Sequence, residues 1–120
     1  MSPVNSRAKG CVGEREVRDL IREAGFPARR GQQFSGGEDS PDVVHELPLD
    51  VHIEVKRVER LNIYDAFEQA VRDAGAGKIP TVWHRRSRKG WLVIMPAGAF
   101  LELVKKAASV EETPMGEMFL

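Results

Sequence analysis

The sequence predicts one mixed α/β domain in which helices pack against a β-sheet. Segments with apolar residues at helical spacing alternate with short apolar or alternating runs typical of strands, and glycine- or proline-rich turns separate them. The 120 residues are enough for one hydrophobic core but too few for two. The expected order is α-β-β-β-α-β-β-α, with residues 1–108 as the domain and residues 109–120 as a C-terminal tail or an arm that packs on a partner.

Three helices are expected because apolar residues recur on one helical face. The first covers residues 9–24 and ends at Gly25, the second ends at Gly75 and Gly77, and Pro96 begins the third. The predicted apolar faces are, in chain order, Val17, Leu20, Ile21 and Ala24; Ile63, Phe67, Ala70, Val71 and Ala74; and Phe100, Leu101, Val104 and Ala108.

Five strands are expected around the second helix. Residues 51–58 alternate well enough to form a half-buried strand. The other predicted strands are residues 26–34, 42–45, 79–84 and 91–95.

Composition and charge limit the possible partners. No apolar run approaches the ~18 residues of a membrane span, and no apolar signal segment is present, so a cytoplasmic location without membrane contact is expected. The single Cys11 excludes an internal disulfide and a thiolate metal site.

The net charge is zero, but its distribution is uneven. Residues 1–37 carry seven Lys/Arg against four Asp/Glu, residues 38–54 carry six carboxylates without a Lys or Arg, and residues 84–90 are basic. This pattern is typical of a cation-binding cleft beside a phosphate-binding rim; ordinary charge scatter on a small surface is the alternative.

Glu54 and Lys56 carry the strongest chemical signal. Residues two apart on a strand project from the same face, roughly 7 Å apart, so both point away from the face of Val51, Ile53 and Val55. The carboxylate can hold a divalent cation while the lysine orients a bound water or neutralises charge on a scissile phosphate. The alternative is an exposed ion pair on a solvated strand face.

Asp42 begins a strand after a glycine-rich loop, and hairpin pairing could bring it to Glu54. Two carboxylates with a backbone carbonyl and waters suit Mg²⁺, although Asp42 could simply cap a turn after Pro41. Glu14 borders the buried stripe of the first helix and needs a partner, which could be a metal, Lys9 or Arg18. Gln69 lies at the edge of the second helix, where its amide could hold a water or phosphate oxygen or be solvated.

These residues resemble the ordered motifs of the PD-(D/E)xK nuclease superfamily. The matching positions are Glu14, Pro41-Asp42, Glu54-Val55-Lys56 and Gln69. Within this superfamily, the chain is more similar to archaeal-type Holliday junction resolvases and their phage-borne relatives. The similarity lies in residues 6–16, Gly25-Phe26, Arg29-Arg30, the Ser-Gly loop and Trp91. The resemblance covers about residues 6–104.

The resemblance implies a restriction-endonuclease-like fold and a homodimeric, Mg²⁺-dependent enzyme that cuts four-way DNA junctions, with Mn²⁺ as a substitute ion. Its catalytic residues would be Glu14, Asp42, Glu54, Lys56 and Gln69, and its metal ligands Glu14, Asp42, Glu54 and the Val55 backbone. Candidate DNA contacts are Arg7, Lys9, Arg29, Arg30, Ser35 and Ser40, with the choice between the two serines open. Interface residues could include Tyr64, Phe67 and Met118-Phe119-Leu120, although Phe67 fits the monomer core equally well.

Three other functions remain open. The chain could be a nuclease of the same superfamily that acts on duplexes, flaps or single-stranded ends. It could be a non-catalytic DNA-binding or assembly protein on the same fold. The neutral charge and the hydrophobic, acidic tail would also fit a structural or partner-binding module.

Overall fold

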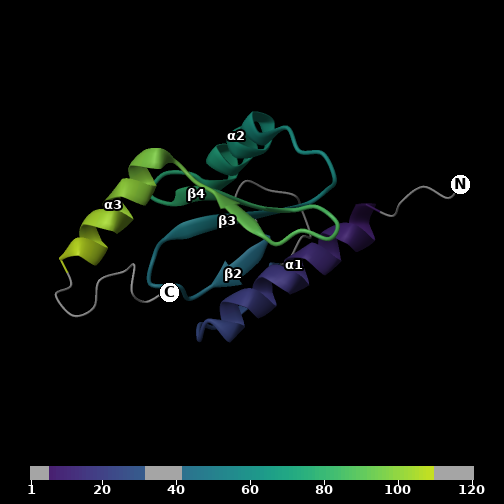
Figure 1. Ribbon diagram of the computed structural model, residues 1–120, viewed down its shortest axis with the longest axis horizontal. Helices are drawn as coiled ribbons and strands as arrows, with labels where there is room; N and C mark the ends of the chain where they lie inside the picture. The colour runs from purple at the N-terminus through teal and green to yellow at the C-terminus, as the bar shows by residue number, and fades with distance from the viewer. Residues whose placement is uncertain (1–5, 32–41, 110–120) are drawn as a thin grey trace, which may run out of the picture.

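The computed structural model describes residues 6–31 and 42–109, with side chains from residue 10 onward (Figure 1). The elements are α1 (Ser6–Glu23), β1 (Ala28–Arg30), β2 (Val43–His45), β3 (Val51–Arg57), α2 (Ile63–Ala74), β4 (Ile79–Arg85), β5 (Leu92–Ile94) and α3 (Ala97–Ala108). This order confirms the predicted α-β-β-β-α-β-β-α architecture.

The strands form two hydrogen-bonded groups. β1 and β2 pair antiparallel, while β3 pairs parallel with β4, and β4 pairs antiparallel with β5, which makes the larger sheet mixed. The predicted strand over residues 26–34 is too long, because β1 covers only Ala28–Arg30 and residues 32–34 lie outside the described part of the chain.

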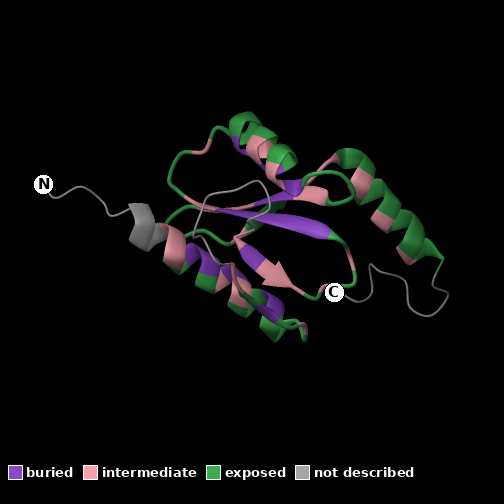
Figure 2. Ribbon diagram, turned by 180° about the vertical axis from the view of Figure 1, so that it is seen from behind, coloured by how far each residue is buried: buried purple, intermediate pink, exposed green. Residues whose placement is uncertain are grey.

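β3, an edge strand of the larger sheet, has helices against both of its faces. Val51, Ile53 and Val55 pack with Val17 and Ile21 of α1, in the larger hydrophobic cluster. α2 lies against β3 (Figure 1), where its Gln69 contacts the alternate residues Glu54 and Lys56. The predicted half-buried strand is therefore wrong in one respect: the first five residues of β3 are all buried, on both faces (Figure 2).

α2 packs on the sheet through alanines. Ala66, Ala70 and Ala74 are its buried residues, and Ala66 and Ala70 pack with Val82 of β4. The predicted apolar face is partly wrong, because Ile63 and Val71 are 48% and 47% exposed. A stripe of small residues spaced four apart lets the helix backbone approach the sheet closely.

The predicted buried face of α3 is wrong for the chain on its own. None of its residues is buried, and Phe100 and Leu101 are each 56% exposed (Figure 2). α3 lies at the outer end of the molecule, beyond β4 and away from α1 (Figure 1). No helix among the described residues has the length and apolar character needed to cross a bilayer.

Gly13 is a point of close contact between α1 and β3. A Cβ atom at this position would lie 3.0 Å from Arg57 Cβ, 3.2 Å from Val55 Cγ1 and 3.5 Å from Trp91 Cη2. The missing side chain therefore sets the height of α1 over β3. It also sets the position of the neighbouring Glu14.

We predict that Gly13→Val destabilises the fold by about 1–3 kcal/mol, because the added methyl groups overpack this contact. Urea unfolding measures the change in free energy. Gly10→Val is the matched control, since a Cβ at Gly10 meets nothing within 4 Å. Equal stability of the two variants would show that α1 can shift away from the sheet at no cost.

Candidate active site

Glu54 lies at the centre of the site, on the face of β3 that α2 covers. It is only 5% exposed, although it carries a carboxylate. A buried charge needs hydrogen bonds and opposite charges around it, because its desolvation is costly. The two oxygens of Glu54 have different partners. Oε1 lies 3.3 Å from His52 Nε2, and Oε2 lies 3.8 Å from Lys56 Nζ.

Asp42 joins the smaller sheet to β3. The backbone N–H of Val55 donates a 2.7 Å hydrogen bond to Asp42 Oδ2, and the N–H of Asp42 donates to the carbonyl of Ile53 at 3.3 Å. These two bonds place the Asp42 carboxyl next to Glu54, with which it also forms a side-chain hydrogen bond. The structure therefore brings the two carboxyl groups together, but not through the predicted hairpin, because β2 pairs with β1 and not with β3.

The two carboxyl groups share one negative charge. Burial and the charge of Glu54 raise the pKa of Asp42 to about 8, against the opposing effect of the Val55 hydrogen bond. Burial also acts to raise the pKa of Glu54, but the hydrogen bond to His52, the charge of Lys56 and the hydrogen bond to Asp42 outweigh it and hold that pKa below its ordinary value. Without a cation, Asp42 thus holds a proton near neutral pH while Glu54 is ionised.

Lys56 and Gln69 complete this side of the site. Lys56 Nζ donates a 2.9 Å hydrogen bond to Gln69 Oε1, and Gln69 Nε2 donates to Glu54 Oε2 at 3.4 Å. The alternative of an exposed Glu54–Lys56 pair is wrong, since the side chain of Glu54 is 6% exposed and that of Lys56, at 27%, is bonded to Gln69 of α2. A cleft of about 430 Å³ begins at Lys56 and Gln69 and runs past Arg60 and Arg72.

Glu14 is 5% exposed and pairs with Arg30, not with Arg18. Arg30 lies 2.9 Å from Glu14 Oε2 and also donates to Cys11 Sγ at 3.0 Å, whereas Arg18 pairs with Asp19. The side chain of Lys9 lies outside the described residues. The charge of Glu14 nevertheless reaches the site, because it contributes to the raised pKa of Asp42.

The predicted DNA contacts are placed only in part. Arg29 is exposed on β1, and Arg30 is engaged by Glu14. The side chains of Arg7 and Lys9, and the whole of Ser35 and Ser40, lie outside the described residues.

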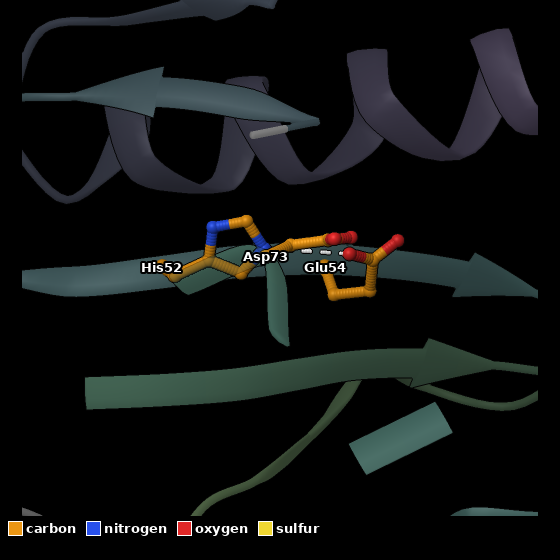
Figure 3. Close-up of side chains that lie close together, drawn as sticks. All are labelled: His52, Glu54 and Asp73. Atoms are coloured by element: carbon orange, nitrogen blue, oxygen red, sulfur yellow. Dashed lines mark hydrogen bonds and ion pairs between the residues drawn. The ribbon is translucent and has the colours of Figure 1, made fainter. Parts of the chain in front are cut away.

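His52 and Asp73 also lie at the site and were missed by the sequence analysis. One ligand atom each of His52, Glu54 and Asp73 lies within 4.8 Å of the others (Figure 3). Among the described His, Cys, Asp and Glu residues, this is the group of three close enough to share one ion; Glu14, Asp42 and Glu54 do not form such a group here. The strand alternation that selected Glu54 and Lys56 also includes His52, and Asp73 lies one helical turn after Gln69.

The donor set on the Asp42 side suits a hard divalent cation. Mg²⁺ takes one or two carboxylates and retains several waters. Asp42, which is half-buried, and Glu54, which is buried, supply two carboxyl groups whose mutual repulsion is relieved here by a proton. A cation between them would relieve it in the same way, so these residues fit a Mg²⁺ ion.

Comparison with known proteins identifies the family. No family model matches this chain, and no curated protein matches it. Among solved structures, the chain is similar to Hjc of the archaeal hyperthermophile Archaeoglobus fulgidus, a Holliday junction resolvase, with 30% identity and a TM-score of 0.54. The match covers 72% of each chain. Because it has the predicted motif order, this fold and this relative, the protein belongs to the archaeal-type Holliday junction resolvase family.

Proposed function

We propose that this protein is a Mg²⁺-dependent endonuclease that resolves four-way DNA junctions by hydrolysing phosphodiesters in opposing strands. The observation that carries the proposal is the convergence of the half-buried Asp42 and Lys56 on the buried Glu54 of β3. The Hjc relative is a Holliday junction resolvase, and that substrate is the one this chain is proposed to share. Mn²⁺ is expected to replace Mg²⁺, because it accepts the same oxygen ligands.

Each residue has a distinct part in the proposed mechanism. Asp42 and Glu54 would hold the cation, with the Val55 carbonyl and Glu14, directly or through water, as further ligands. When bound, the cation polarises the scissile phosphate and lowers the pKa of an attacking water. Lys56, which is hydrogen-bonded to Gln69, would position that water and neutralise charge on the phosphate.

The first prediction concerns Glu54. Glu54→Gln keeps the shape of the side chain but removes the charge, so we expect cleavage of a synthetic four-way junction in Mg²⁺ to fall at least about 100-fold. Junction binding should change little, because it depends on phosphate contacts. Gel assays of cleavage and binding measure the two effects.

The matched control for this variant is Glu46→Gln, since Glu46 is exposed and lies next to β2. A Glu54→Gln enzyme that cuts as fast as Glu46→Gln would refute the assignment. Parallel assays with duplex, flap and single-stranded DNA test the other nuclease activities of this superfamily. If the enzyme cut one of these substrates faster than the junction, that DNA would be its substrate instead.

The second prediction follows from the raised pKa of Asp42. A carboxyl whose pKa is raised on folding contributes stability that is complete below its unfolded pKa and is lost as pH rises toward the folded pKa of about 8. In EDTA, Asp42→Asn should therefore unfold at a higher temperature than the wild type above pH 8, with the difference shrinking toward pH 4. Thermal unfolding across this range measures it, and a difference that grows toward acid would contradict the assigned proton.

Mg²⁺ should reverse this pH effect in the wild-type protein. The ion binds ionised Asp42, so its binding releases a proton and strengthens as pH rises to about 8. Stabilisation by Mg²⁺ should be absent from Asp42→Asn.

The proposal includes a homodimer, because two symmetric cuts need two sites. The exposed apolar residues of β5 and α3 provide a surface for it: Leu92, Val93, Phe100, Leu101 and Val104 are 45–63% exposed. Of the residues predicted for the interface, Tyr64 is 80% exposed, Phe67 packs in the core, and residues 118–120 lie outside the described part.

The third prediction tests this surface. We expect wild-type protein to sediment at twice the 13.4 kDa of one chain and Leu101→Glu to sediment as a monomer, since a charge in an apolar interface is costly. Val71→Glu is the matched control, because Val71 is an exposed apolar residue on another helix. If the Leu101→Glu variant remained dimeric, the interface would lie elsewhere. A monomeric wild type would refute the paired-cut mechanism.

A further inference from the structure

We propose that His52, Glu54 and Asp73 form a second cation site, selective for a dication that binds imidazole, with Zn²⁺ as the best fit. The site is separate from the oxygen-only site of Asp42 and Glu54 and goes beyond the proposed nuclease function. The two sites would share the carboxylate of Glu54.

The first support is the arrangement of two rows of side chains. His52, Glu54 and Lys56 alternate along one face of β3, and Gln69 and Asp73 lie one turn apart on α2. Gln69 meets Lys56 and Glu54 Oε2, while Asp73 lies beside His52 and Glu54 (Figure 3). The two oxygens of Glu54 thus face two different sets of groups.

The second support is the state of the three side chains. His52 is 2% exposed, and its Nε2 lies 3.3 Å from Glu54 Oε1, a separation that one metal ion bound to both atoms would also require. Asp73 is half-buried, and among the described residues its carboxylate has no hydrogen bond or ion pair. An unpaired carboxylate within 4.8 Å of a buried imidazole and a second carboxylate is a ready ligand.

The third support is the chemistry of the donors. Two carboxylates and a neutral imidazole balance the charge of a dication, and water can supply a fourth, tetrahedral ligand. Imidazole favours zinc over magnesium, which prefers oxygen ligands. The ion would lie on the His52 side of Glu54, with Oε2 left facing Lys56 and Gln69.

The other two histidines of the chain are poorly placed for such a site. His45 Nε2 contacts the Val51 carbonyl at 2.8 Å, and its Nδ1 accepts from Leu47 N. His84 Nε2 contacts the Val58 carbonyl at 2.9 Å. A metal bound at the proposed site should therefore act on His52 before either of them.

The test is a titration of the metal-free full chain with Zn²⁺, without DNA, monitored by the imidazole ¹⁵N resonances of its three histidines. We expect the Nε2 resonance of His52 to shift first, with one ion bound per chain by calorimetry. Asp73→Ala removes one ligand and should weaken binding on the order of tenfold or more. Glu68→Ala, an exposed carboxylate on the same helix, should bind Zn²⁺ as the wild type does.

The inference is overturned if His52 keeps its metal-free resonance at saturating Zn²⁺, or if Asp73→Ala binds as tightly as Glu68→Ala. Alanine is a good helix former, so Asp73→Ala should fold, and its thermal unfolding verifies this. Zinc binding at His52 without junction cleavage in Mg²⁺ would refute the nuclease proposal alone. Cleavage without zinc binding would refute the second site alone.

Discussion

The hydrogen bond from Val55 N to Asp42 Oδ2 connects the two halves of this fold. The β1–β2 pair and the β3–β4–β5 sheet are separate hydrogen-bonded groups, and this 2.7 Å bond crosses the seam between them. A side chain thus satisfies a strand N–H that a neighbouring strand would otherwise satisfy. The same bond fixes the Asp42 carboxyl beside Glu54, so the contact that completes the fold also assembles the carboxyl pair.

The carboxyl groups gathered around this bond destabilise the folded state. Glu14 and Glu54 are each 5% exposed, and Asp42 lies close enough to both for their charges to raise its pKa. Arg30 and Lys56 compensate only part of this charge, since Asp42 still needs a proton. A core built for stability alone would place apolar residues here. Such local conflict is typical of a functional site, where a bound cation supplies the missing charge.

Part of this arrangement can be predicted from the sequence. Alternation along β3 correctly separates the face of Ile53 from the face of Glu54, and helical spacing finds all three helices. Alternation does not show what covers the second face, and here the cover is α2. The sequence correctly places Ala70 on the buried face of α2, but it misses Ala66, which packs against β4. It also favours bulky Ile63 and Val71, which are exposed. The packing of α2 against β4, and not the local sequence pattern, decides which residues of α2 are buried.

Glu54 lies between two different sets of side chains, so one carboxylate could take part in both proposed kinds of chemistry. Toward Lys56 its surroundings offer an ammonium group and an amide, which suit water and phosphate oxygens. Toward His52 they offer an imidazole and the carboxylate of Asp73, which suit a softer dication. Because both sides act on the same buried group, an ion on one side must alter the charge available on the other. Any coupling between them is then reciprocal, as linkage requires.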